Sequence, residues 1–203
     1  MLIHNKLESS TVNGPGNRAV IWFQGCSLGC KGCWNPETHS FDNLLETSIY
    51  EVEDWLCNLP DIEGVTFSGG EPMQQASSLL ILMARVRARN PQLSFGMYTG
   101  YSQKELDLGS FKWKSMFDAE WKKGSKELWT EVKGYLDFAV LGRYNQLVRV
   151  TDNSLPLIGS TNQELVFFTE RYKPSDLEAG YEVHIPADGS TVSMTGFPVG
   201  VIE

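Results

Sequence analysis

The stretch Ala19-Val20-Ile21-Trp22-Phe23-Gln24-Gly25-Cys26-Ser27-Leu28-Gly29-Cys30-Lys31-Gly32-Cys33 decides the fold of this chain. Its first five residues are apolar, several of them β-branched or aromatic, and they predict a buried strand. Three cysteines follow, spaced C-x3-C-x2-C. In α/β proteins the functional sites lie at the carboxyl ends of the strands. The cysteines that follow this strand are therefore the first candidate site.

Cys26, Cys30 and Cys33 provide one ligand fewer than a closed metal site, because structural zinc and [4Fe-4S] clusters normally take four protein ligands. Three thiolates could hold three irons of a [4Fe-4S] cluster and leave the fourth iron open to a small molecule. The alternative is a zinc ion whose site is completed by His39 or Cys57. Zinc sites commonly use two separated C-x-x-C pairs, and the sequence has no second pair, so the spacing favours the cluster. We expect Cys57 to be a buried packing residue.

The composition describes a globular protein of one domain. The chain has 203 residues, of which 41% are hydrophobic, and 17 Lys and Arg against 25 Asp and Glu give a formal charge of −8. This acidic balance argues against broad binding to nucleic acid or to anionic membranes. Residues 1–8 do not resemble a signal peptide, and no window approaches a membrane span. We therefore expect a cytoplasmic protein with reduced thiols, whose clustered cysteines serve metal or redox chemistry.

Further strands and helices alternate along the chain. Apolar runs predict strands at 64–67, 93–98 and 135–141, and helical spacing of apolar residues predicts helices at 48–58 and 79–86. The polar stretch 103–134 is expected to be mostly helical. This alternation predicts the α/β class, with a mostly parallel sheet and helices outside it. In the tail, 165–169 is expected to be a short strand, and 182–185 with 191–194 a hairpin.

Ser68-Gly69-Gly70-Glu71-Pro72 follows the predicted strand at 64–67. Two glycines allow the backbone to approach a ligand closely, and Glu71 could accept a hydrogen bond from a ligand amine. Alone, the motif would also fit a tight turn with an exposed acid. Its position after a strand, downstream of the cysteine loop, favours a ligand-binding role.

The chain resembles the radical S-adenosylmethionine (SAM) superfamily. Cys26, Cys30 and Cys33 match that family's cluster motif, and Gly69-Gly70-Glu71-Pro72 matches its SAM-binding motif. Within the family it is similar to the glycyl-radical-enzyme activases, most of all to the activating protein of anaerobic ribonucleotide reductase. The segments that carry this narrower resemblance are 12–18, 25–26, 32–35, 99–101, 154–156 and 159–163.

The resemblance implies an incomplete (β/α)6 radical SAM barrel over 1–163, with 164–203 as a C-terminal strand and hairpin extension of the same domain. It also implies a radical SAM oxidoreductase. A [4Fe-4S] cluster would cleave SAM reductively to a 5′-deoxyadenosyl radical, which would generate a glycyl radical on a partner enzyme. The alternative is a radical SAM enzyme that acts on a different peptide or a small molecule. A non-enzymatic protein with a structural zinc is a third reading, but such a module has no need of a Gly-Gly-Glu-Pro loop.

The resemblance also assigns the cofactor contacts. Cys26, Cys30 and Cys33 would bind the cluster, whose open iron takes the amino and carboxylate groups of SAM. Gly69, Gly70 and Glu71 would hold the methionyl amine of SAM, and Thr99 would face its sugar or methionine part. Trp34 would pack near the adenine, or else be a core aromatic residue. The electron must come from outside, from a flavodoxin- or ferredoxin-like donor, because one cluster and no flavin motif are visible.

One segment departs from the family pattern. Many activases carry Asp-x-Lys at the end of a later strand, facing the ribose and carboxylate of SAM, where this chain has Leu141-Gly142-Arg143. Arg143 could still pair with a carboxylate, but Leu141 cannot accept a hydrogen bond from ribose. Together with the long C-terminal segment, Leu141 favours the alternative substrate.

Overall fold

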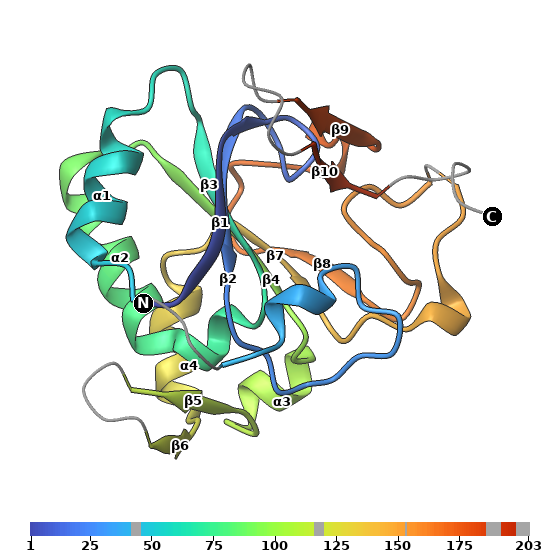
Figure 1. Cartoon of the computed structure of the whole chain (residues 1–203), viewed down its shortest axis with the longest axis horizontal. Coiled ribbons are helices and arrows are strands. Elements are labelled where there is room, and N and C mark those ends of the chain that lie inside the picture. The colour runs from blue at the N-terminus through green and yellow to red at the C-terminus, as the bar shows by residue number, and fades with distance from the viewer. Residues whose placement is uncertain (42–45, 116–119, 153, 186–191, 198–203) are drawn as a thin grey trace.

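A six-stranded sheet forms the centre of the molecule (Figure 1). The computed structural model describes residues 1–41, 46–115, 120–152, 154–185 and 192–197. Along the sheet the strand order is β1-β2-β3-β4-β7-β8. The bounds of these strands are β1 Ile3–Ser10, β2 Arg18–Phe23, β3 Gly64–Gly69, β4 Ser94–Thr99, β7 Phe138–Leu141 and β8 Glu164–Phe167.

The four central strands are parallel, which confirms the expected α/β class. β2 pairs with β3, β3 with β4 and β4 with β7. Their side chains are almost all buried, because a parallel sheet is covered on both faces, and this is why each strand reads as a near-continuous apolar run. The carboxyl ends of all four strands lie at the same end of the sheet.

Helices cover one face of this sheet. They are α1 (Ile49–Asn58), α2 (Ala76–Arg89) and α4 (Lys126–Lys133), on the left in Figure 1, with the short α3 (Gln103–Asp107) at the edge. α1 begins where Ser48 accepts a hydrogen bond from the Tyr50 amide, a standard N-cap. Both helices expected from apolar spacing are present.

Short 3-10 turns occur at Pro36–Thr38, Pro72–Gln75, Gln146–Val148 and Pro174–Asp176. Among the described residues no helix has the length and apolar character needed to span a membrane.

A buried carboxylate joins α1 to α2. Glu53 is 3% exposed and accepts hydrogen bonds from Arg85 Nε at 2.5 Å and Arg89 Nη1 at 3.4 Å. Both arginines are partly exposed, so solvent screens the pair and its contribution is modest.

We expect Glu53→Gln to lower the free energy of unfolding by about 1–2 kcal/mol, because one partner of a partly buried ion pair is removed. Glu51→Gln, at an exposed position of the same helix, should change it by less than about 0.5 kcal/mol. Urea unfolding of both variants measures the difference. Equal effects at the two positions would show that the pair with Arg85 contributes nothing.

The two edge strands differ from the expected repeat of six strand–helix units. β1 was not predicted, and it pairs antiparallel with β2. β8, expected from the apolar run at 165–169, pairs antiparallel with β7. β1 is largely exposed, so residues such as His4, Asn5 and Lys6 can occupy it without forming an apolar run.

The expectation of a mostly helical segment over 103–134 was wrong in its middle. Between α3 and α4 the chain forms an antiparallel hairpin of β5 (Lys112–Lys114) and β6 (Trp121–Lys123). Gly109 takes a φ of +64° that ends the helical stretch after α3. The two short strands read Lys-Trp-Lys and Trp-Lys-Lys, and none of their residues is fully buried, so no apolar run marks them.

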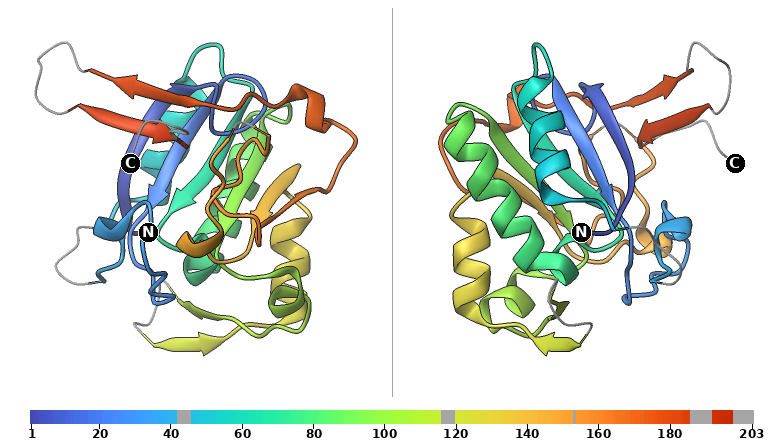
Figure 2. Two further views of the ribbon diagram at one scale, coloured as in Figure 1. Left: turned by 90° about the vertical axis from the view of Figure 1, so that its right-hand side faces the viewer. Right: turned by 60° about the vertical axis from the view of Figure 1, so that its left-hand side comes forward.

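The tail forms the expected hairpin, from β9 (Tyr181–His184) and β10 (Ser193–Gly196). Residues 186–191 between them lie outside the described residues. The hairpin stands on the side of the sheet opposite the helices (Figure 2). It is tied to the N-terminal part of the chain: Asn13 Nδ2 donates to Thr195 Oγ1 at 2.8 Å, and Glu182 Oε1 accepts from the Thr11 amide at 2.8 Å.

Candidate active site

The carboxyl ends of the four parallel strands open into a cavity of about 210 Å³. The cysteine loop follows β2, Gly69-Gly70-Glu71 ends β3, Thr99-Gly100 ends β4 and Gly142 follows β7. The structure therefore brings together most of the site residues expected from sequence. The expected residues that line the cavity are Cys26, Cys30, Cys33, Trp34, Gly69, Gly70, Glu71 and Thr99.

Backbone and side-chain hydrogen bonds position the cysteine loop. The amide of Cys26 donates to the His39 carbonyl at 3.1 Å, and the amide of Gly25 donates to the Thr38 carbonyl at 2.7 Å. Gln74, which is fully buried, accepts from the Ser27 amide at 3.0 Å and donates to the Ser27 hydroxyl at 2.8 Å. The loop is thus held at its base, close to its first cysteine.

The three thiols lie in a partly desolvated environment. Burial, and next to it the negative charge of Glu71, raises the pKa of the Cys26 thiol to about 12. Burial also raises the pKa of Cys30 and Cys33, although the positive charge of Arg143 opposes the rise at Cys30. Metal binding would have to displace these protons, as it does at thiolate sites in general.

The donor set fits an iron–sulfur cluster. Among the described residues, no three His, Cys, Asp or Glu side chains are placed to hold a single metal ion. In a [4Fe-4S] cluster each thiolate binds a different iron, so cluster ligands need not converge on one point. His39 lines the cavity, whereas Cys57 is half-buried in α1 and packs against the core. The expectation that Cys57 is a packing residue agrees with this position.

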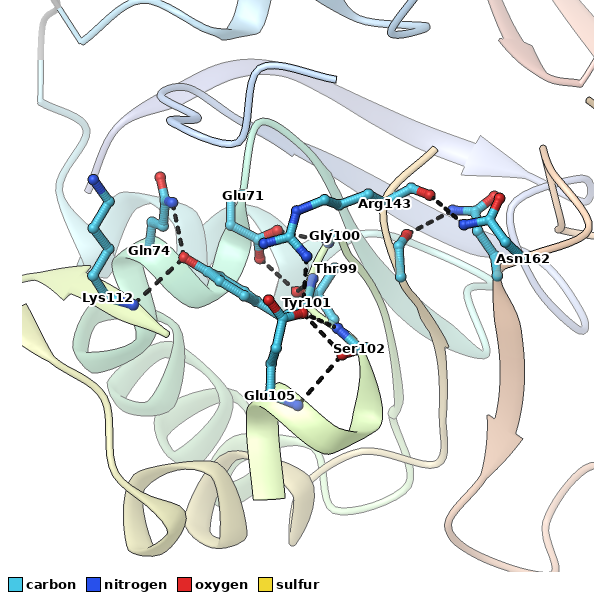
Figure 3. Close-up of polar contacts among 12 residues, drawn as sticks. Glu71, Gln74, Thr99, Gly100, Tyr101, Ser102, Glu105, Lys112, Arg143 and Asn162 are labelled. Carbon is cyan, nitrogen blue, oxygen red and sulfur yellow. Dashed lines mark hydrogen bonds and ion pairs between the residues drawn. The ribbon is translucent and has the colours of Figure 1, made fainter. Parts of the chain in front are cut away.

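Glu71 connects the ends of two strands. Its Oε1 accepts from the Thr99 hydroxyl at 2.7 Å, and its Oε2 accepts from the Gly100 amide at 2.7 Å (Figure 3). Oε1 also accepts from the Met73 amide at 2.9 Å. Burial raises the pKa of Glu71 to about 7, although these hydrogen bonds act in the opposite direction. A carboxylate has about four acceptor positions. The described residues use three of them, which leaves one on Oε2, and Glu71 lines the cavity.

The two glycines before Glu71 leave no space for side chains. A Cβ added to Gly70 would lie 2.5 Å from the Gly25 carbonyl oxygen, and one added to Gly69 would lie 2.6 Å from the Phe23 nitrogen. Gly69 also has a φ of +89°, which other residues rarely adopt. These glycines allow the β3 loop to lie directly against the start of the cysteine loop.

Arg143 lies beside the cavity but is not among its lining residues. Its Nη1 pairs with Glu105 Oε2 at 2.8 Å, and its carbonyl accepts from Asn162 Nδ2 at 2.9 Å (Figure 3). The hydrogen bond from Arg143 lowers the pKa of Glu105 to about 2. Leu141 is 1% exposed and packs in the core.

An aromatic group closes the other side of the cavity. Trp34 packs edge-on against Tyr144 and Phe197, with ring centroids 6.0 and 5.7 Å apart. Trp34 Nε1 is buried and has no hydrogen-bond partner within the described part of the chain. The tail thus supplies part of the cavity wall.

Sequence reasoning did not identify Gln74, Asn13 or Phe197 as site residues. Gln74 follows the Gly-Gly-Glu-Pro motif by two positions, but glutamine in a turn carries no signal by itself. Asn13 belongs to the segment 12–18, which was noted for its resemblance alone. Phe197 follows the predicted hairpin, and no local pattern places it beside Trp34, 163 positions earlier.

Comparison with known proteins gives consistent matches. Residues 12–166 match the model of the 4Fe-4S single cluster domain. The chain is 31% identical to the anaerobic ribonucleoside-triphosphate reductase-activating protein of Vibrio cholerae, over 83% of this chain and 99% of that protein. It is 33% identical to the protein of the same name from Escherichia coli K12, over 55% of this chain and 77% of that protein. The corresponding protein of phage T4 is 31% identical over 58% and 81%.

Proposed function

The chain belongs to the family of anaerobic ribonucleoside-triphosphate reductase-activating proteins, and from this premise we propose that it generates a glycyl radical on such a reductase by radical SAM chemistry. One observation carries the proposal: three loop cysteines, the Gly-Gly-Glu loop and Thr99 line a single cavity at the carboxyl ends of four parallel strands. We also propose that this sheet is a partial radical SAM barrel over 1–163, extended by 164–203 within the same domain.

The cavity residues suit the two groups. Cys26, Cys30 and Cys33 would hold three irons of a [4Fe-4S] cluster and leave the fourth for SAM. When bound, the reduced cluster would supply one electron that cleaves SAM to methionine and a 5′-deoxyadenosyl radical. The free acceptor position of Glu71, beside the backbone of Gly69 and Gly70, would bind the methionyl amine.

The remaining contacts are assigned by position. The Thr99 hydroxyl donates to Glu71, so Thr99 would hold that carboxylate beside the methionine part of SAM. Trp34 would pack near the adenine, where its Nε1–H, which has no partner among the described residues, offers a hydrogen bond. Arg143, paired with Glu105, would add positive charge near the cluster and the SAM carboxylate. The electron would come from an external one-electron carrier of the flavodoxin or ferredoxin type.

A second substrate class deserves a direct test because of two observations. Leu141 is buried where many activases have a carboxylate, and Thr195 and Phe197 of the tail line the cavity. A different peptide or a small molecule would use the same radical.

The test combines the reconstituted, reduced protein with SAM and an anaerobic ribonucleoside-triphosphate reductase. We expect a glycyl-radical doublet in the EPR spectrum together with 5′-deoxyadenosine, and no doublet with a reductase variant that lacks the radical glycine. Formation of 5′-deoxyadenosine without the doublet would support the second substrate class. If neither product forms, the proposed function is wrong.

A further inference from the structure

The β5–β6 hairpin concentrates positive charge on a chain whose formal charge is −8. In its ladder Lys112 is opposite Lys123, and Lys114 is opposite Trp121. Opposite residues, and residues two apart in a strand, share a face of a sheet, so these four side chains lie on one face, here called the lysine face. Among the described residues of this segment, Glu120, exposed directly before β6, is the one carboxylate.

The positive charges of the lysine face repel one another, and this repulsion destabilises the hairpin. Like charges directly opposite each other, as in the pair of Lys112 and Lys123, destabilise a sheet. The Trp121 ring offsets part of this cost, because Nζ of Lys112 and of Lys114 lie 4.5 and 5.7 Å from its centroid. Within the described residues, Lys112, Lys114 and Lys123 form no ion pair with a carboxylate. Their ammonium groups are therefore available to a negatively charged partner.

An aromatic contact joins the lysine face to the cysteine loop. Phe41 packs edge-on against Trp121, with ring centroids 5.3 Å apart. Phe41 also covers Gly25, since a Cβ added there would lie 2.3 Å from Phe41 Cε1. Because Gly25 precedes Cys26, Phe41 connects Trp121 of the lysine face to the residue before the first cysteine of the loop.

A chain of hydrogen bonds makes a second connection (Figure 3). The Lys112 amide donates to the Tyr101 hydroxyl at 3.4 Å, and Gln74 Nε2 donates to the same hydroxyl at 3.0 Å. Gln74 in turn binds the amide and hydroxyl of Ser27, the residue after Cys26. Two independent routes thus place the hairpin firmly against the loop.

We infer that the lysine face is the docking surface for a small acidic protein that carries single electrons. This inference rests on the proposed function, which requires an external reductant. The reduced carrier loses one electron and the cluster gains it, and no bond is made or broken. Opposite charge steers such a carrier to this face, and the contacts through Trp121 and Phe41 bring it close to the cysteine loop. Figure 1 shows the β5–β6 hairpin at the end of the molecule away from β9 and β10.

The experiment compares two charge-reversed variants of the cluster-loaded protein, with an acidic bacterial flavodoxin as the probe. Lys112→Glu/Lys123→Glu alters the lysine face. Lys6→Glu/Lys173→Glu changes the net charge by the same amount at two other exposed lysines. Titration calorimetry at about 50 mM and 200 mM salt measures the dissociation constants. We expect the lysine-face variant to bind about tenfold or more weakly at low salt, with a flatter salt dependence, and the control to change less than threefold.

The first variant keeps a like-charged pair at the same ladder position but loses the contact between Lys112 and the Trp121 ring. Thermal midpoints of both variants are therefore measured, and binding is compared at a temperature at which both are folded. Unchanged binding by the lysine-face variant, or equal weakening by both variants, would overturn the inference. Dithionite-driven formation of 5′-deoxyadenosine by the wild-type protein tests the proposed function separately. If that reaction occurs but the dissociation constant does not depend on Lys112 and Lys123, only the assignment of the docking surface is wrong. If the reaction is absent while binding depends on them, the proposed function alone is wrong.

Discussion

Replacing Cys30 with alanine is expected to abolish both the bound cluster and the cleavage of SAM. Two remaining thiolates can hold only two irons, which leaves the cluster with two unligated irons in place of one. Loss of a hydrogen bond to a metal ligand alone lowers metal affinity about 10–100-fold. Loss of a ligand itself should lower the affinity for the cluster by at least about tenfold, and iron content should fall with it. Anaerobic reconstitution, the visible absorption spectrum and an assay for 5′-deoxyadenosine provide the readouts.

Cys57→Ala is the matched control, because Cys57 is the one cysteine of the sequence outside the loop and packs against the core. It should retain colour, iron and SAM cleavage. A Cys30→Ala protein that stays brown and still forms 5′-deoxyadenosine would show that the ligand assignment is wrong. A colourless wild-type protein that takes up zinc instead would support the structural metal site.

The second large effect is expected from Glu71→Gln. Both oxygens of Glu71 accept a backbone N–H, from Met73 and from Gly100. A glutamine of the same shape must therefore point its NH₂ group at one of these donors, whichever way it is turned. An unmet buried donor and the loss of charge-assisted bonds should lower the free energy of unfolding by about 2–3 kcal/mol.

The same change should weaken SAM binding at least tenfold, because the amide places either an NH₂ donor or an uncharged oxygen where Oε2 offered a charged acceptor, and about 1.4 kcal/mol corresponds to a factor of ten. Urea unfolding and equilibrium dialysis of SAM at pH 8, above the pKa of about 7, measure the two effects. Glu37→Gln, at an exposed position near the loop, is the control. Normal SAM affinity in a folded Glu71→Gln protein would contradict the role of Glu71 toward the methionyl amine.

The central strands could be predicted because burial on both faces requires apolar residues at nearly every position of the strand. Ala19–Phe23 and Phe138–Leu141 are apolar almost throughout, and both are strands. β1 lies at an edge and exposes most of its side chains, so its sequence was free to be polar and gave no signal. The hairpin of β5 and β6 was missed for the same reason.

The candidate site could be located from sequence, but its internal contacts could not. Parallel strands bring their carboxyl ends together, so motifs after different strands were expected to meet, and they line one cavity. The partners of Glu71 are different: Thr99 and Gly100 come from β4, 28 and 29 residues later. Pairing of this kind depends on three-dimensional distance alone, as does the pairing of Arg143 with Glu105.

The hydrogen bond between Asn13 and Thr195 spans 182 positions of the chain, so the two ends of the domain are joined directly beside the cavity. Met194–Phe197 line the cavity, and this part of its wall therefore depends on contacts between the first and the last residues described. A chain shortened before Met194 would present its cysteines in a more open cavity.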